Sequence, residues 1–470
     1  MAIATSTSDA ALLEPLPSAL PTVERRAAIP AGFVAAGGIA GIKASGRPDL
    51  AIVATLPGGE GRGLTPAAAA AVFTPNAFAA APVRLSPDYL AATEPSGGGR
   101  YGWATGIVST SGSANAATGP AGDEDQAAVA NLLAQALGTP EAMTLLLSTG
   151  VIGTRLPLDK VASGIAAIAP TATPTDAGLA AAAEALRTTD TRVKSATVTL
   201  ALPDPDGLAV RSIRVTGIAK GVGMIHPRMA TMLSIVLTDA TVEPGTLHGL
   251  LRPAAARTWD QLTVDGDTST NDTVFLLASG AAGAAPVQAG THEAAALGGA
   301  IEAVARDLAR QQAADGEGAT TLVTCQVSGA TDDADARAVA RAVVSSSLVK
   351  AAVHGRDPNW GRVAGAAGNA MVADEAVLAA AGLPAEAARA RAGSPAAVDP
   401  ARLRIAIAGH LVFDGTAGGP VAFDRAAARA AMDAPELLIR LDLGLGTGTG
   451  EAFGCDLTQE YVIENSEYTT

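Results

Sequence analysis

The stretch KGVGMIHPRMATMLSIVL, residues 220–237, gives the strongest indication of the fold. Its first part is a glycine-rich, cationic loop, whereas Thr231–Leu237 is short and apolar almost throughout. A short apolar run without alternation is typical of a strand that is covered on both faces. We therefore predict a strand at 231–237, buried between layers and preceded by a tight loop.

Further strands are expected on both sides of this stretch. Apolar residues alternate with other residues at 198–202, 323–327, 403–407 and 439–443, which indicates half-buried strands. Because strands and helices are mixed along the whole length, the fold class that we expect is α/β, built as a layered sandwich.

Two helices are predicted from apolar spacing. Residues 129–137 repeat at helical intervals, follow acidic residues 123–125 and stop at Gly138. A second helix is expected to begin at Asp332 and run to about His354. The Ala/Gly/Pro-rich segments 282–299, 375–400 and 416–422 are expected to be connections.

Composition excludes several classes of function. The 470 residues weigh 46.3 kDa and include 52 glycines but only 3% aromatics, so an aromatic platform for bases is not expected. The net charge of −14 repels phosphate backbones and anionic membranes. We therefore expect no nucleic-acid partner.

The sequence also predicts where the protein works. No apolar run approaches the roughly 18 residues that span a bilayer, so no membrane association is expected. Residues 1–30 lack the pattern of a signal or transit peptide and are expected to form a loose N-terminal arm. The two cysteines, Cys325 and Cys455, form no CxxC motif, which fits a reducing cytoplasm.

Standard catalytic and metal templates are absent from the sequence. It has no P-loop, GxGxxG, HExxH or GxSxG motif, and its five histidines are scattered. The run at 265–276 begins like a calcium loop but has Thr270 in place of the glycine and Leu276 in place of the bidentate glutamate. No metal site is expected.

Five clusters of glycine with small polar residues remain as candidates for a site. Each alone is typical of a tight turn, but together they favour a site built from backbone amides and hydroxyls. They lie at 148–153, 220–233, 263–273, 315–320 and 357–362.

The step from Ala230 to Thr231 fits self-cleavage. The Thr231 hydroxyl could attack the Ala230 carbonyl in a strained loop, and hydrolysis of the ester would make Thr231 a new N-terminus. The freed α-amine, with a pKa of about 7.7 to 8.0, could then serve as the general base for its own hydroxyl. The alternative is a threonine that merely begins a strand.

From this loop outward the chain resembles the ornithine acetyltransferase family, also called arginine biosynthesis bifunctional protein or glutamate N-acetyltransferase. The motifs that carry the resemblance run in order over more than nine-tenths of the chain. They include STGVIGTRLPLDK (148–160), KGVGMIHPRMATML (220–233), LTVDGDTSTNDTV (262–274), DGEGAT (315–320), SSSLVKAAVHGRDPNWGR (345–362) and CDLTQEYVIENSEYTT (455–470).

The resemblance implies a role for individual residues. Thr231 would be the nucleophile and Ala230–Thr231 the cleaved bond, while Thr149 and Gly150 would form the oxyanion hole. The residues that would bind the amino-acid substrate are Lys220, Thr231, Glu317, Asn465, Thr470 and either Thr188 or Thr189.

The resemblance also implies a fold and a reaction. The fold would be an α-β-β-α sandwich of the N-terminal-nucleophile kind with mixed sheets, plus a smaller α/β domain in the C-terminal half. The α chain would span 31–230 after the arm, and the β chain 231–470. Acetyl would pass from N2-acetylornithine to glutamate through Thr231 in arginine biosynthesis, without a metal or cofactor and in a heterotetramer of two α and two β chains. Acetyl-CoA is left open as a co-substrate.

The cleavage loop departs from the family pattern at three positions. Val222, His226 and Arg228 stand where Ser, Ala and Asn are usual, which leaves the processing rate open. Two other functions also stay open: an N-terminal-nucleophile aminopeptidase or amidase on a similar fold, and an unprocessed protein that binds an amino acid.

Overall fold

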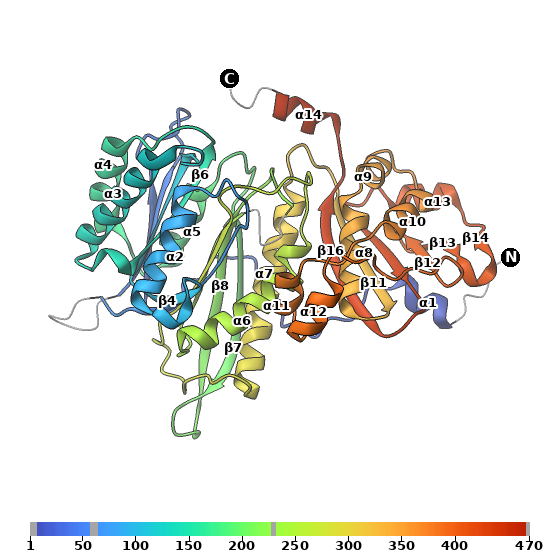
Figure 1. Ribbon diagram of the computed structural model, residues 1–470, viewed down its shortest axis with the longest axis horizontal. Coiled ribbons are helices and arrows are strands. Elements are labelled where there is room, and N and C mark those ends of the chain that lie inside the picture. Colours follow the sequence, from blue (N-terminus) through green and yellow to red (C-terminus); the bar gives the residue numbers. More distant parts are fainter. Residues whose placement is uncertain (1–6, 57–63, 227–231, 467–470) are drawn as a thin grey trace.

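The computed structural model describes residues 7–56, 64–226 and 232–466 (Figure 1). The described chain forms two bodies, a four-layered sandwich and a smaller α/β body, with one long helix between them. This arrangement confirms the expected fold class, including the smaller unit in the C-terminal half.

The first sheet of the sandwich has four strands in the order β1-β2-β5-β6. Apolar residues on its outer face pack against α3 and α4 in one buried cluster that includes Val129 and Ile165. The elements are β1 (Phe33–Gly38), β2 (Leu50–Thr55), β5 (Gly106–Ser113), β6 (Thr144–Val151), α3 (Gly119–Leu137) and α4 (Leu158–Ile168). Helices α2 (Ala81–Thr93) and α5 (Asp176–Leu186) lie beside this sheet.

The second sheet has six strands in the order β4-β3-β10-β9-β8-β7. Its two central strands, β9 and β10, run parallel to each other, and β8 and β3 flank them antiparallel. The strands are β3 (Ala67–Phe73), β4 (Tyr101–Ala104), β7 (Lys194–Pro203), β8 (Val210–Lys220), β9 (Leu233–Thr238) and β10 (Thr273–Ala278).

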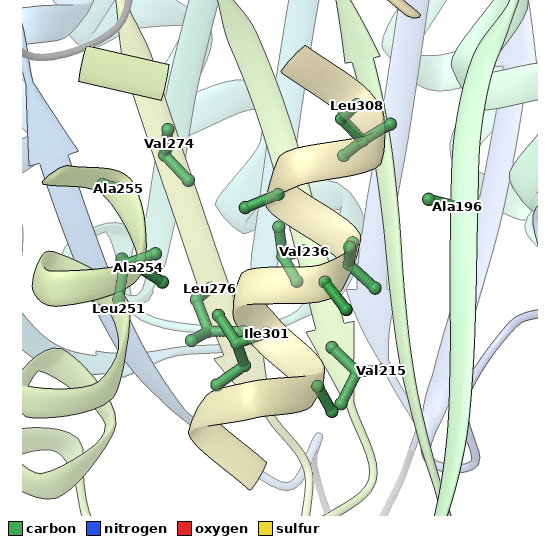
Figure 2. Close-up of a cluster of buried hydrophobic side chains, with 14 of the residues drawn as sticks. Ala196, Val215, Val236, Leu251, Ala254, Ala255, Val274, Leu276, Ile301 and Leu308 are labelled. Carbon is green, nitrogen blue, oxygen red and sulfur yellow. The ribbon is translucent and has the colours of Figure 1, made fainter. Parts of the chain in front are cut away.

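The second sheet is covered on both faces, as the apolar run at 231–237 predicts. One face meets the first sheet in a core that includes Phe33, Leu145 and Phe275. The other face meets α6 (Pro244–Arg257) and α7 (His292–Ala314), and Figure 2 shows Ile301 and Leu308 of α7 above the strands. All six residues of β9 are buried.

Alanine determines how closely these layers approach. In β3, Ala67, Ala69 and Ala71 point into the core between the sheets, whereas Ala68 and Ala70 point toward the helices. The side chains of a strand alternate between its two faces, and in β3 most of them are alanine. The alanine-rich composition therefore reflects close packing here and not only connecting segments.

The smaller body contains the third sheet, with strands in the order β14-β13-β12-β15-β11-β16. Helices α8 and α10 cover one face of it, and α7 contacts β11 and β16. The strands are β11 (Leu322–Ala330), β12 (Arg404–Ile407), β13 (His410–Asp414), β14 (Gly419–Pro420), β15 (Glu436–Asp442) and β16 (Gly448–Cys455). The helices are α8 (Asp333–Ser345), α9 (Ser347–His354), α10 (Trp360–Gly368), α11 (Glu375–Ala380), α12 (Ala385–Arg391), α13 (Arg425–Ala431) and α14 (Gln459–Ser466).

The predicted strands and the first helix are confirmed. The strands at 198–202, 323–327, 403–407 and 439–443 correspond to β7, β11, β12 and β15. Helix α3 ends at Gly138, which adopts a left-handed φ of 64°.

The helix predicted from Asp332 to His354 is wrong as a single element. It breaks at Ser346, whose backbone is extended and whose Oγ accepts a hydrogen bond from the Val349 backbone N–H at 3.3 Å. Ser346 thereby caps a new helix, α9, because a serine oxygen can satisfy a free N–H at a helix N-terminus.

Two expected connections are partly helical instead. Helix α7 begins at His292 within 282–299, where Thr291 Oγ1 accepts from the Ala294 N–H at 3.2 Å. The segment 375–400 contains α11 and α12. Alanine has the highest helix propensity, and this preference outweighs the glycine and proline nearby. The segment 416–422 is a connection except for the end of a short 3-10 helix (Gly415–Ala417) and the two residues of β14.

The residues expected to form the N-terminal arm lie against both bodies where they are described. Helix α1 (Thr7–Leu13) contacts β13 and β15, and its Leu12 is buried. Farther along, Glu24 exchanges two backbone hydrogen bonds with Thr197 of β7, at 2.8 and 2.9 Å. Among the helices described, none is long and apolar enough to cross a bilayer.

Leu308→Ala tests whether α7 holds the sandwich together. Leu308 is fully buried, and it packs so close to β8 that a Cβ on Gly217 would lie 2.6 Å from its Cδ1. We expect the substitution to lower the free energy of unfolding by about 2–5 kcal/mol through lost contacts and a cavity. Urea denaturation followed by circular dichroism measures this loss.

The matched control is Leu208→Ala, because Leu208 is 88% exposed. It should change stability by no more than about 0.5 kcal/mol. Equal effects of the two substitutions would contradict the role given to α7.

Candidate active site

One cavity of about 390 Å³ gathers the predicted site residues that the structure describes. They come from the end of β6, the loop before β7, the end of β8, the loop after α7, and α14. These lining residues are Thr149, Gly150, Thr188, Thr189, Lys220, Glu317 and Asn465. They are far apart in sequence, so only the fold brings them together.

Three predicted residues lie outside the described part of the chain. They are the cleavage-bond residues Ala230 and Thr231 and the terminal Thr470. A small cleft of about 30 Å³ shares Thr149 and Lys220 with the cavity and is also lined by Met232 and Leu233. The chain that follows Thr231 therefore begins at the site.

The geometry at the end of β6 requires glycine at position 150. Gly150 has a φ of 132°, and a Cβ there would lie 2.3 Å from the carbonyl carbon of Gly112 on β5. A side chain is excluded both by this conformation and by the neighbouring backbone. Next to it, Thr149 Oγ1 accepts a hydrogen bond from Lys220 Nζ at 3.2 Å.

Lys220 places an ammonium group in the wall of the cavity. Burial lowers its pKa from the ordinary lysine value, and the carboxylate of Asp190 opposes that shift. A desolvated ammonium group beside a hydroxyl is suited to bind a carboxylate from a ligand.

Glu317 supplies the opposite charge, and its neighbours hold it in place. Its Oε1 accepts from Thr189 Oγ1 at 2.8 Å and its Oε2 accepts from Asn465 Nδ2 at 2.9 Å. Its backbone N–H donates to the Val222 carbonyl at 2.9 Å. A Cβ on Gly223 would lie 2.3 Å from Glu317 Oε2, so the glycine leaves room for the carboxylate. Of the two threonines predicted as alternatives, Thr189 is the one bonded to Glu317.

A buried ion triad joins the loops that carry these groups. Lys194 Nζ lies 2.6 Å from Asp190 Oδ1 and 2.6 Å from Asp315 Oδ2, and all three side chains are at most 3% exposed. Asp190 also accepts from the N–H groups of Gly221 and Thr188, at 2.8 and 3.0 Å. Through Lys194 the triad connects three loops. They are the loop with Thr188 and Thr189, the loop that begins at Gly221, and the loop with Glu317.

The triad keeps Asp190 ionised. Burial would raise the pKa of Asp190, but Lys194, Lys220 and the Gly221 N–H together outweigh burial and hold that pKa well below its usual range. Sequence reasoning missed Lys194 and Asp190, since they fall in no motif, and it used Asp315 only as part of a glycine turn.

Residues 265–276, which begin like a calcium loop, hold neighbouring loops of the site by hydrogen bonds. Asp265 accepts from the N–H groups of Met224 and Ile225, at 2.5 and 2.8 Å. Asn271 Nδ2 donates to the carbonyls of Ala114 and Ser148, at 2.7 and 2.8 Å, which fixes the strand end before Thr149. No group of three or more metal-ligand side chains occurs in the described ranges.

Four of the five glycine clusters contribute lining residues, and the fifth does not. Residues 357–362 lie at the N-terminus of α10, where Asn359 Oδ1 accepts from the Arg362 N–H at 3.2 Å. The expectation that this cluster belongs to the same site is wrong, because a helix cap is built from the same residue types as a polar site. Lining residues without a predicted role are Val151, Ile152, Met224, Ser269, Thr270 and Asn271.

Val222 and His226, two of the three residues that depart from the family pattern at 220–233, have contacts that the structure describes. The Val222 side chain is 2% exposed, and its carbonyl holds the Glu317 loop. His226 Nδ1 lies 3.1 Å from Thr263 Oγ1. Arg228 lies outside the described residues.

Lys194→Met tests the ion triad. The substitution leaves two carboxylates buried without their counter-ion, so we expect a loss of about 3–5 kcal/mol in the free energy of unfolding. Chemical denaturation measures the loss. The control is Arg192→Met. Arg192 Nε also lies near Asp315, 3.6 Å from its Oδ1, but the Arg192 side chain is 55% exposed.

We expect the control to lose no more than about 1 kcal/mol, since an exposed pair contributes little. A Lys194→Met protein as stable as Arg192→Met would show that the triad does not hold the loops.

Comparisons with known proteins identify the family of this chain. Residues 34–470 match the model of the ArgJ family. The arginine biosynthesis bifunctional protein ArgJ of a Synechococcus species is 43% identical over 445 residues, which cover 94% of this chain and 96% of that protein. The ArgJ protein of Deinococcus radiodurans is 41% identical and is covered completely, over 98% of this chain.

Solved structures of similar chains are known. An ArgJ structure from Bacillus halodurans has 37% sequence identity and a TM-score of 0.44, covering 50% of this chain and 99% of that one. An ornithine acetyltransferase from Mycobacterium tuberculosis, complexed with ornithine, also has 37% identity, with a TM-score of 0.36 and coverage of 44% of this chain and 100% of that one. The family match over most of the chain and the two full-length relatives above 40% identity establish that this chain belongs to the ArgJ family of arginine biosynthesis bifunctional proteins.

Proposed function

We propose that this chain is a self-cleaving glutamate N-acetyltransferase that moves acetyl from N2-acetylornithine to glutamate through an acetyl-Thr231 intermediate. As a member of the ArgJ family it is an acetyltransferase of arginine biosynthesis. The observation that carries the finer proposal is the cavity itself, which sets Thr149 and Gly150 beside one ammonium and one carboxylate group.

Two opposite charges make the cavity suited to an α-amino acid. Lys220 would bind the substrate carboxylate and Glu317 a substrate ammonium group. Thr189 and Asn465 each bond one oxygen of Glu317, so that carboxylate is oriented before a ligand arrives. Thr470 would complete the binding site.

The chemistry would begin with self-cleavage. Thr231 Oγ attacks the Ala230 carbonyl, the peptide C–N bond breaks, and Ala230 is then esterified to the hydroxyl. Water hydrolyses this ester and leaves Thr231 with a free α-amine. That amine removes the hydroxyl proton in the next reaction.

Acetyl transfer would then proceed in two halves. Thr231 Oγ attacks the acetyl carbonyl of N2-acetylornithine, the Thr149 hydroxyl and the Gly150 N–H stabilise the oxyanion, and ornithine leaves with the proton on its amine. The amine of glutamate attacks the acetyl-Thr231 ester and restores the free hydroxyl. Each preorganised donor to the oxyanion contributes roughly 10²–10³ in rate.

The position of the cut fits two chains that stay together. Residue 231 lies between β8 and β9, which are neighbouring antiparallel strands of one sheet. After cleavage, β9 and β10 would remain between β8 and β3. The pair would assemble as two α and two β chains in the cytoplasm, where Cys325 and Cys455, both buried and free, would stay reduced.

Thr231→Ala tests the nucleophile. Wild type should give fragments of 230 and 240 residues, since 470 − 230 = 240, whereas the variant should stay one chain of 46.3 kDa because no hydroxyl attacks Ala230. Intact mass spectrometry measures processing, and transfer of acetyl from N2-acetylornithine to glutamate measures activity, with and without acetyl-CoA. Thr231→Ser keeps the hydroxyl and should still be cut.

Three outcomes would each contradict one part of this proposal. Fragments of the same size from Thr231→Ala would remove Thr231 as the cleavage nucleophile. Release of acetate without glutamate would favour the amidase. An uncut wild-type chain that binds an amino acid without turnover would favour the binding protein.

The pH profile tests Lys220. Because burial lowers its pKa, Lys220 loses its proton at a lower pH than an ordinary lysine, so KM for N2-acetylornithine should rise on the alkaline side. Lys220→Met should raise KM about 10–100-fold at neutral pH and abolish the alkaline rise, since a hydrogen bond to a charged group contributes about 1.5–3 kcal/mol. Initial rates between neutral and alkaline pH measure both effects.

The control for this profile is Lys160→Met. Lys160 is exposed on α4 and donates to the Gly41 carbonyl at 2.7 Å, away from the cavity. Its substitution should leave the profile as in wild type. A Lys220→Met enzyme that keeps the wild-type KM and alkaline rise would refute the carboxylate-binding role.

A further inference from the structure

A second cavity, of about 480 Å³, lies between the two bodies. It is lined by α7, the first turns of α8, strands β11 and β16, and residues 16–20 of the N-terminal segment, which we call the strap. The strap is fixed to the third sheet by the Leu16 backbone N–H, which donates to Gln326 Oε1 at 2.7 Å. None of the residues assigned to acetyl transfer lines this cavity.

Arg337 on α8 is a mostly buried cation in the wall of this cavity, and its one ion pair is long. Its side chain is only 9% exposed, and its nearest counter-charge, Asp333 Oδ2, lies at 4.0 Å. Its guanidinium group makes no hydrogen bond to any residue in the part of the chain that the structure describes. Burial lowers the pKa of Arg337, which reflects the same lack of solvation. A guanidinium group has five N–H donors, and those of Arg337 are left for a ligand in the cavity that its side chain lines.

The two other arginines that line the cavity are already paired. Arg257 Nη2 lies 2.5 Å from Glu302 Oε2, and Arg306 Nη2 donates to Glu451 Oε2 at 2.7 Å. Asp333 has a hydrogen-bond partner of its own, because its Oδ1 accepts from the Thr449 backbone N–H at 2.9 Å. Arg337 is thus the lining guanidinium that still lacks a hydrogen-bonded carboxylate.

We propose that this cavity is a binding site for a small carboxylate ligand, held by a bidentate pair with Arg337. The planar guanidinium fork matches a carboxylate with two parallel N–H···O bonds. The neighbouring carboxylates of Glu302, Glu451 and Asp333 favour a singly charged ligand over a phosphate dianion, since each added negative charge is repelled by theirs.

Occupation of the cavity would connect three parts of the chain. The ligand would bind Arg337 on α8 in a cavity whose other walls are α7 and the strap, and would therefore favour the folded junction of the two bodies. A ligand that binds only the folded state raises the unfolding temperature in a saturable manner.

The test is a thermal-unfolding titration of the full-length protein with sodium acetate, inorganic phosphate or chloride at constant ionic strength. We expect acetate to raise Tm saturably above chloride, with phosphate weaker than acetate. Arg337→Gln should weaken the apparent affinity for acetate about tenfold or more, because the charge and the bidentate pair are both lost. Arg337→Lys keeps the charge and should show an intermediate affinity.

The matched control is Arg310→Gln. Arg310 lies one turn after Arg306 on α7, and its Nη2 lies 2.7 Å from Glu436 Oε2. Neither Arg310 nor Glu436 lines the cavity. It should keep the wild-type acetate response.

Two results would overturn the proposal. One is a wild-type protein whose Tm responds equally to acetate and chloride. The other is an Arg337→Gln or Arg337→Lys variant with the wild-type affinity, which would place the acetate in the catalytic cavity instead. Phosphate binding more tightly than acetate would overturn the ligand class. Since the readout is binding, these results are independent of whether acetyl transfer occurs as proposed.

Discussion

The buried contact of Lys194 with Asp190 and Asp315 is the constraint on which the candidate active site depends. Removing three charges from water is costly, and the cost is offset only when each charge is paired and hydrogen-bonded. Here the backbone N–H groups of Gly221 and Thr188 complete the shell of Asp190. Lys220 adds a second cation near Asp190, so that two lysines balance two aspartates. The triad therefore joins the loop with Thr188 and Thr189, the loop that begins at Gly221, and the loop with Glu317.

Helix α7 has a similar function on a larger scale. It packs on β7 and β8 of the sandwich and also on β11 and β16 of the smaller body, with Arg306 and Arg310 over the Phe453 ring. The loop with Glu317 follows the end of this helix directly. The position of Glu317 is thus fixed by the junction of the two bodies as well as by the ion triad.

Much of the architecture was predictable from the sequence, because it depends on local patterns. The unbroken apolar run after Thr231 predicted a strand covered on both faces, and Gly138 predicted the end of α3. The break at Ser346 was missed because the apolar spacing continues through it. Helix α7 was not predicted, and its first turns were expected to be part of a connection because they are rich in alanine and glycine. At the site, motifs named most lining residues. Lys194 and Asp190 were missed because their significance depends on contacts between distant segments, which no spacing along the chain reveals.

The strand order of the second sheet has a consequence for how the molecule can be made. Strands β9 and β10 follow the proposed cut and fill the centre of a sheet whose other four strands precede it. Neither fragment alone would contain a complete sheet, so we expect the fold to form before the proposed cut. If the bond is cut as proposed, the strands of this sheet would belong to two separate chains, which would have to associate before the sheet could form again. The mature protein would keep its structure through the slowness of unfolding, and a denatured sample would not regain it at the rate of the uncut chain.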